Sequence, residues 1–117
     1  MTGFLTTHVL DTARGCPASG IKVELFLHKN GTTNKINEAV TNTDGRTDTP
    51  MLPQGSFKTG QYELIFHAGD YLRATDQAAE EPIFLDEIPI RFAMSLDNHY
   101  HVPLLLSAHG YSTYRGS

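Results

Sequence analysis

The chain has 117 residues, a formal net charge of −4 and an isoelectric point of about 5.8, and 39% of its residues are hydrophobic. This length fits one domain over residues 1–117 that can bury roughly two thirds of the surface its unfolded chain exposes. The acidic balance argues against a nucleic-acid partner and against a basic membrane-binding helix. No apolar run approaches the ~20 residues that span a bilayer, so we expect no membrane partner and a small molecule as the ligand.

The start of the chain and its cysteine content indicate the cytoplasm. The opening MTGFLTTHVLD has no basic stretch followed by an apolar one, as a secretory signal would have. Cys16 is the only cysteine in the sequence, which excludes an internal disulfide and suits a reducing compartment. We therefore expect a cytoplasmic protein in which Cys16 has no catalytic role.

The first predicted strand, Phe4–Asp11, has two faces that both need cover. The faces alternate along the strand, with Leu5, Thr7 and Val9 on one and Phe4, Thr6, His8 and Leu10 on the other. The first set is typical of a core face. The second set is half apolar and carries a histidine, so it is not expected to face bulk water.

Alternation of apolar and polar residues also predicts strands around residues 21–28, 62–67 and 88–94. Turn residues rich in Gly, Asn, Asp and Pro separate these segments. The segment Asp70–Ala79 contains good helix formers, and Asp70 is a suitable N-cap, so we predict one short helix there.

The last long strand, His99–Ser107, is again two-sided. One face has Tyr100, Val102, Leu104 and Leu106, and the other has His99, His101, Pro103, Leu105 and Ser107. A chain of this length cannot cover both faces of two strands by itself. We therefore expect an oligomer in which His8 and His101 point into the interface.

Taken alone, these polar residues have simpler interpretations. A single histidine on a strand is more often a hydrogen-bonded structural residue than a catalyst. His99 and His101 lie two apart on one face and could chelate zinc, but no cysteine pair or His-Glu-x-x-His motif supports a metal site. Arg46 would be a solvated residue leaving a turn, and Tyr114 and Arg115 would be tail residues. The residues alone thus indicate an oligomeric β-sandwich with an unassigned polar cluster.

Three stretches resemble the transthyretin-related proteins that act as 5-hydroxyisourate hydrolases. They are LTTHVLDTARGCPASGIKVEL, TNTDGRT and the C-terminal HYHVPLLLSAHGYSTYRGS. The resemblance covers essentially the whole chain and implies an all-β, transthyretin-like β-sandwich of about eight strands in two sheets with one short helix. It also implies a homotetramer with active sites in the dimer–dimer channel. Ala108 departs from the Ser-Pro sequence usual in this family, at a position outside the site.

The resemblance implies hydrolysis of 5-hydroxyisourate to 2-oxo-4-hydroxy-4-carboxy-5-ureidoimidazoline in urate degradation, without a metal or an organic cofactor. His8 and His101 are the expected acid–base pair, because imidazole gives or takes a proton near neutral pH. Arg46 is expected to bind the substrate or its oxyanion. Tyr114 and Ser117 are expected to contact the substrate, which would give the C-terminal tail a role in catalysis.

Two other functions remain open at this stage. One is a binding and transport module like transthyretin itself, which has Lys, Glu and Thr where this chain has His8, Arg46 and His101. The other is an inactive structural or metal-storing relative. A carrier needs no ionisable pair poised near neutrality, so the residues favour the hydrolase.

Overall fold

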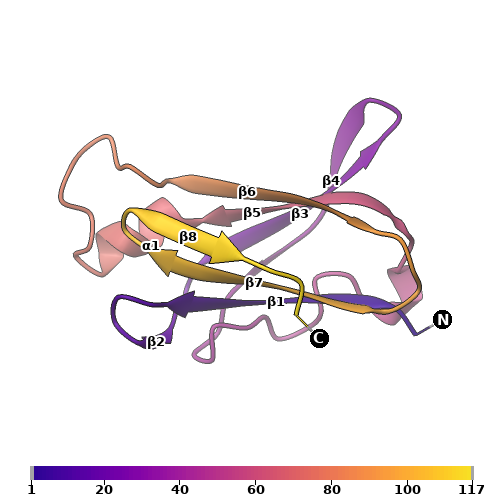
Figure 1. The fold of residues 1–117 in the computed structure, drawn as a ribbon, viewed down its shortest axis with the longest axis horizontal. Helices are drawn as coiled ribbons and strands as arrows, with labels where there is room; N and C mark the ends of the chain where they lie inside the picture. The colour runs from indigo at the N-terminus through magenta and orange to yellow at the C-terminus, as the bar shows by residue number, and fades with distance from the viewer. Residues whose placement is uncertain (1, 117) are drawn as a thin grey trace.

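Two four-stranded sheets lie face to face in the computed structural model, which describes residues 2–116 (Figure 1). One sheet has the strand order β2-β1-β7-β8 and the other β4-β3-β5-β6. The strands are β1 Phe4–Asp11, β2 Cys16–Pro17, β3 Lys22–Lys29, β4 Thr32–Val40, β5 Gly60–His67, β6 Glu87–Met94, β7 His99–Ser107 and β8 Gly110–Thr113. The helices are the 3-10 turn η1 Gln54–Ser56 and the α-helix α1 Ala68–Ala74. This confirms the predicted all-β sandwich with one short α-helix.

The alternation in the sequence becomes the two faces of each strand. Along β1, every second residue from Leu5 is buried and the residues between are half-buried. Strands β3, β5 and β7 send their apolar sets into the same core. Burial of a Leu, Ile or Phe side chain stabilises the fold by roughly 1.5–3 kcal/mol. The largest fully buried side chains are Leu5, Ile21, Leu25, Met51, Tyr62, Leu64, Phe66, Leu72, Ile88, Met94, Leu104 and Leu106.

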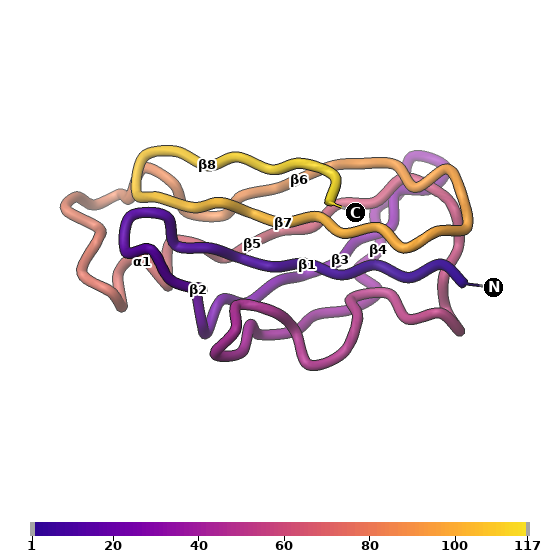
Figure 2. Tube along the Cα trace, turned by 60° about the horizontal axis from the view of Figure 1, so that its bottom comes forward, coloured from indigo at the N-terminus to yellow at the C-terminus, as the bar shows by residue number. Residues whose placement is uncertain are grey.

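The central pair of the first sheet is parallel, and it joins the two ends of the sequence. Strand β1 pairs with β7 along its whole length, in a register that places Phe4 beside His99 and Thr6 beside His101. Because side chains alternate across a strand, the outward residues of both strands meet on one face of the sheet. Figure 2 shows β1, β7 and β8 side by side on this layer, with the C-terminus turned back toward β7.

Strand β4 is a long strand that no alternation in the sequence predicts, as is also true of the short strands β2 and β8. Seven of its nine residues are exposed, so no apolar set marks a core face. Its pairing with β3 shifts register between Leu25 and Phe26, where β4 has the extra residue Ile36. Such a bulge lets one extra residue into a strand and bends it. In Figure 1 the β3–β4 hairpin rises away from the rest of the molecule.

The helix differs from the prediction at both ends. It begins at Ala68 with His67 as its N-cap residue, so Asp70 lies in the first turn and is not the N-cap. The start is earlier because β5 runs directly into the helix and the backbone N–H of Gly69 finds its acceptor in the carbonyl of Asp86, at 2.9 Å. The end is earlier because Asp76 takes a left-handed backbone with φ of 58°. No helix within residues 2–116 is long and apolar enough to cross a membrane.

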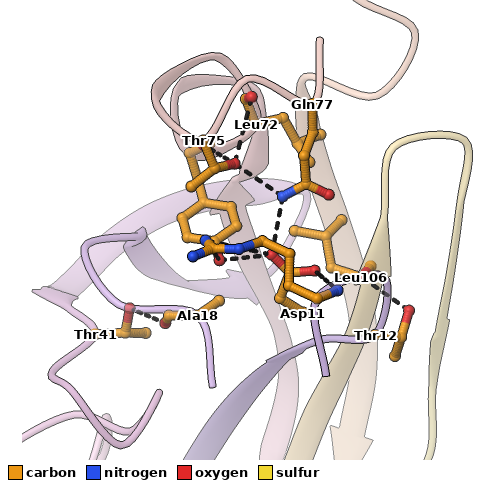
Figure 3. A network of polar contacts seen from close by, with 10 residues as sticks. Asp11, Thr12, Ala18, Thr41, Leu72, Thr75, Gln77 and Leu106 are labelled. Carbon is orange, nitrogen blue, oxygen red and sulfur yellow. Dashed lines mark hydrogen bonds and ion pairs between the residues drawn. The ribbon is translucent and has the colours of Figure 1, made fainter. Parts of the chain in front are cut away.

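A buried carboxylate ties the helix region to the end of β1 (Figure 3). Asp11 accepts hydrogen bonds from the Tyr71 hydroxyl at 2.7 Å, from the Gln77 side chain at 2.9 Å and from the backbone N–H of Arg14 at 3.0 Å. Burial pulls the pKa of Asp11 upward, but these bonds outweigh it, so the pKa lies below its ordinary value of 3.8. Asp11 therefore stays ionised and joins the end of β1 to helix α1 and to the residues that follow the helix.

Candidate functional site

A pocket of about 320 Å³ opens on the outer face of the first sheet. It is lined by Thr6, Thr7, Arg46, Thr47, His99 and His101. The β1–β7 pairing supplies the histidine side, and the loop after β4 supplies the arginine side. Residues from three distant parts of the sequence therefore meet at one place.

Of the two predicted catalytic histidines, His101 lines this pocket and His8 lies beside His101. His8 comes from β1 and His101 from β7, and their ring centroids are 6.5 Å apart with the planes tilted by 31°. The two rings are therefore close enough for both to contact one small ligand.

The Asp-Gly-Arg turn is fastened to β1 by its backbone. Val9 donates its N–H to the carbonyl of Gly45 at 2.8 Å, and Arg46 forms a bridge with His8. Asn42 organises the turn, since its side-chain oxygen accepts the backbone N–H groups of Asp44 at 2.9 Å and Arg46 at 3.2 Å. Arg46 is therefore held at its backbone, while its exposed side chain lines the pocket.

Gly45 explains why the turn approaches so closely. Its φ of 74° lies in the left-handed region, and a Cβ there would stand 2.4 Å from the carbonyl oxygen of Val9 and 3.2 Å from Cδ2 of His8. Only glycine has both the backbone freedom and the space. The glycine thus sets the distance between the arginine turn and the first histidine.

The electrostatics of the pocket keep both rings neutral at neutral pH. Burial and the charge of Arg46 lower the pKa of His8, against a backbone hydrogen bond and the charge of Asp44 that raise it. Burial and Arg46 also lower the pKa of His101, with smaller contributions from His99 and His8. A neutral imidazole carries one N–H donor and one lone pair, so each ring can act as a base.

Thr6 is a pocket residue that the sequence did not single out. Its hydroxyl oxygen lies 2.7 Å from Nε2 of His99 and 2.8 Å from Nδ1 of His101. His99 in turn stacks on Phe4, with ring centroids 4.0 Å apart and planes 6° from parallel. The sequence could have indicated Thr6 as a site residue only because Thr6 shares a strand face with His8. Its histidine partners lie more than 90 residues away in sequence.

The His99–His101 pair is engaged in these hydrogen bonds. In the part of the chain that the structure describes, no group of three His, Cys, Asp or Glu side chains is arranged to hold a metal ion. The carboxylates that contact other histidines lie elsewhere: Glu24 with His67 and Glu63 with His28 in the second sheet, and Glu80 with His109 in the loops. The chemistry of this pocket is that of imidazole, hydroxyl and guanidinium groups.

The C-terminal tail reaches the site through its backbone. After β8 the chain turns back, and Gly116 donates its N–H to the carbonyl of His101 at 2.7 Å. Tyr114 lies elsewhere: it is 59% exposed and lines a separate, mainly apolar groove with Arg115, whose guanidinium carbon is 4.3 Å from the Tyr100 ring centroid. Within one chain, the structure thus brings together His8, Arg46 and His101 but not Tyr114. Ser117 lies outside the described residues.

Comparison with known proteins identifies the family. Residues 5–116 match the model of the HIUase/Transthyretin family. The chain belongs to this family. A relative named 5-hydroxyisourate hydrolase 2, from Rhizobium meliloti (strain 1021), is 52% identical over 117 residues, which is 99% of this chain and 98% of that protein.

Solved structures agree with the family assignment and with the predicted transthyretin-like fold. The Klebsiella pneumoniae 5-hydroxyisourate hydrolase is 30% identical with a TM-score of 0.78, and the match covers 98% of this chain and 94% of that one. An (S)-allantoin synthase is 44% identical with a TM-score of 0.91. This second match covers 98% of this chain but 44% of the longer synthase chain.

Proposed function

We propose that this protein hydrolyses 5-hydroxyisourate to 2-oxo-4-hydroxy-4-carboxy-5-ureidoimidazoline in urate degradation. The observation that carries the proposal is the meeting of Arg46 with His8 and His101, whose pKa values are lowered by burial and by the Arg46 charge. The relatives named for this activity support the choice of substrate. A carrier would not need two neutral bases at the ligand, so the transport function is not favoured.

In the proposed reaction His8 is the general base. A water oxygen bonds to the carbonyl carbon of the six-membered ring, and its proton passes to the neutral His8 ring. The C–N bond then breaks, and the nitrogen that leaves takes up a proton on the side of His101. The ring opens to a carboxylate, and no cofactor is required because the substrate carbonyl is itself the electrophile.

Arg46 is assigned to the substrate and to the developing oxyanion. Its guanidinium is permanently charged and offers a planar pair of donors that fits two acceptor oxygens at once. The turn that carries Arg46 is held by backbone hydrogen bonds, so little reorganisation is needed as charge develops. Arg46→Lys should therefore remain impaired in kcat, since lysine keeps the charge but loses the fork. Recovery of full activity in Arg46→Lys would remove this role.

The tail residues belong to the proposal through assembly. Tyr114 is exposed and does not line the histidine pocket of its own chain. We assign it to positioning substrate only in the homotetramer, where a neighbouring protomer supplies the other side of the site. Ser117 is assigned to a hydrogen bond with the substrate. Tyr114→Phe should raise KM more than it lowers kcat, and an unchanged KM would remove Tyr114 from the site.

The homotetramer itself is proposed from the outer face of the first sheet. In register, His8 stands beside Pro103, and Leu10 stands beside Leu105, so the histidine pocket continues directly into an apolar strip. A second chain that covers this strip would convert the open pocket into part of a channel. Leu105→Glu should disperse the tetramer in light scattering and abolish activity together. A stable and active monomer of the wild-type protein would contradict the assembly.

The activity is tested with substrate made in place. Urate oxidase converts urate to 5-hydroxyisourate, whose ultraviolet absorbance decays slowly without a catalyst. Catalytic amounts of this protein should accelerate that decay, and decay at the spontaneous rate would remove the proposed function.

The cytoplasm is the proposed compartment, because a single cysteine suits a reducing environment. Cell fractionation tests the compartment independently of the activity.

A further inference from the structure

The hydroxyl of Thr6 bridges two imidazole rings, one at the rim of the pocket and one inside it. Thr6 stands beside His101 in the β1–β7 register, and its oxygen is 2.7 Å from Nε2 of His99 and 2.8 Å from Nδ1 of His101. Both distances are those of good hydrogen bonds. His99 is exposed to solvent, whereas His101 is half-buried. The three side chains thus form a continuous hydrogen-bonded path from solvent to the pocket.

This path has a direction. A hydroxyl has one hydrogen, so if it donates to one ring it must accept from the other. In one direction, His99 donates from Nε2 to Thr6 and Thr6 donates to Nδ1 of His101, which leaves the proton of neutral His101 on Nε2. In the opposite direction, His101 donates from Nδ1 and its Nε2 carries the lone pair. The orientation of the Thr6 hydroxyl therefore selects the tautomer of His101.

Packing fixes both rings in the geometry that this selection needs. The Phe4 ring is stacked on His99 at 4.0 Å, which restrains the rotation of the exposed imidazole. On the other side, the backbone of Gly116 lies against His101 so closely that a Cβ there would be 2.7 Å from Cδ2. Rings held in this way do not need to be ordered at the moment of reaction.

The proposed hydrolysis needs a proton donor near His101. Burial of His101 and the charge of Arg46 beside it both disfavour an imidazolium at this position. A neutral imidazole can still donate from Nε2 if it receives a proton at Nδ1 in the same step. Thr6 is placed to deliver that proton.

We propose that Thr6 is a positioning residue that links His99 and His101 into a proton wire, with His99 donating to Thr6 and Thr6 donating to His101. This inference rests on the proposed hydrolase function. As the C–N bond of the substrate breaks, its electron pair stays on nitrogen, which takes the Nε2 proton of His101. Nδ1 of His101 takes the Thr6 proton, Thr6 takes the Nε2 proton of His99, and Nδ1 of His99 takes a proton from solvent.

The wire is reset by the proton that the attacking water gave up. Protonated His8 returns that proton to Nε2 of His101, and the wire runs backward until Nδ1 of His99 releases a proton to solvent. One proton enters and one leaves at His99, while the net reaction converts water and substrate into ring-opened product. His101 never becomes an imidazolate or an imidazolium during the cycle.

The test compares Thr6→Val, which keeps the shape but removes the hydroxyl, with Thr6→Ser, which keeps the hydroxyl. Thr12→Val is the matched control. Thr12 follows β1, and its hydroxyl donates to the Leu106 carbonyl of β7 at 3.0 Å, away from the pocket. Thr6→Val should lose about 10²-fold in kcat with little change in KM, and Thr6→Ser and Thr12→Val should stay near wild type. Light scattering and thermal unfolding establish that each variant is assembled.

Two further measurements separate the wire from a structural role of Thr6. Solvent isotope effects in mixtures of H2O and D2O should give a curved dependence for wild type, since several protons move together, and a linear one for Thr6→Val. ¹⁵N NMR of labelled histidine in the wild-type protein without substrate should show His101 protonated at Nε2. Normal kcat in Thr6→Val, or protonation of His101 at Nδ1 in the wild type, would overturn the wire.

Failure of the wire and failure of the proposed function give different results. If wild type accelerates 5-hydroxyisourate decay and Thr6→Val does so equally, the function stands and the wire is wrong. If wild type does not accelerate the decay, the proposed function is wrong and the wire falls as a catalytic device, whatever tautomer the NMR spectrum shows. The wire stands only if activity, isotope dependence and tautomer agree.

Discussion

Gly116 lies against the imidazole of His101, and its N–H donates to the His101 carbonyl at 2.7 Å. A Cβ at Gly116 would stand 2.7 Å from Cδ2 of that ring, closer than real Cβ contacts come. The glycine near the end of the chain therefore serves the histidine, because any side chain there would push the ring. This contact is how the C-terminal tail reaches the site within one chain.

Gly116→Ala should displace His101 and lower kcat by up to about 10²-fold, since small misplacements of a catalytic group have effects of this size. Stability should hardly change, because the substitution lies at a chain end. The control is Gly110→Ala, whose Cβ would meet its nearest neighbour, the Ser107 hydroxyl, at an ordinary 3.8 Å. Equal kcat values for the two variants would show that the contact with His101 is not needed.

At Gly45, the effect of the close contact with Val9 can be measured separately from the effect of the left-handed backbone. Gly15 and Gly45 both have left-handed φ values, 68° and 74°, but a Cβ at Gly15 would meet nothing within 4 Å. Gly15→Ala should therefore lose only the strain contribution, of order 1–3 kcal/mol in the free energy of unfolding. Gly45→Ala adds a clash with the Val9 carbonyl, so it should lose more stability and should also lose activity by moving Arg46 and His8. Similar losses in both variants, measured by denaturation and kcat, would contradict this explanation.

The buried Asp11 carboxylate should make stability depend on acid pH. Because its pKa in the fold lies below its ordinary value of 3.8, the unfolded chain binds the proton more readily, and stability is lost as pH falls below about 3.8. Tyr71→Phe removes one hydrogen bond to this charge, which should cost about 1.5–3 kcal/mol near neutral pH and less in acid. Tyr62→Phe removes a bond to the neutral Lys58 carbonyl and is the control. If Tyr71→Phe lost the same free energy of unfolding near neutral pH and in acid, the role of the charge would be contradicted.

The activity should persist to lower pH than free histidine would allow. The pKa values of His8 and His101 are both lowered from 6.5, so the rings stay neutral at pH 6.5 and become protonated only below it. On the acid side, the midpoint of the pH dependence of kcat/KM should therefore lie below pH 6.5. This apparent pKa belongs to the coupled pair. NMR titration of Arg46→Gln should move both ring pKa values upward, because a cation is removed. An acid limb at or above 6.5 in wild type would contradict the proposed electrostatics.

The strands that surround a core could be predicted from sequence because burial leaves a period of two. Phe4–Asp11 and His99–Ser107 have the faces that the alternation indicates, except that Pro103, expected on the outer face, is buried. Strand β4 could not be predicted in this way, since it buries almost nothing, and the helix end depends on the left-handed backbone of Asp76. Local sequence does not determine where a strand joins a helix or where a residue other than glycine adopts a left-handed backbone.

The sequence likewise predicted some residues of the site and missed others. Residue patterns alone gave Arg46 as a solvated turn residue, and the family resemblance was needed to place it with His8 and His101. Thr6 was missed because its role depends on the parallel register between β1 and β7, which joins residues 95 positions apart. No spacing within either strand encodes that register, so only the folded structure shows which hydroxyl meets which ring.

The most direct test of the proposed catalysis measures 5-hydroxyisourate decay by wild type, His8→Ala, His101→Ala and the double variant, each confirmed to be assembled. Each single variant should lose about 10²–10⁴-fold in kcat. The double variant should lose much less than the product of the two, since groups that act as one unit are not additive. Wild-type rates in the single variants would contradict catalysis by the histidine pair, even if the protein accelerates the decay.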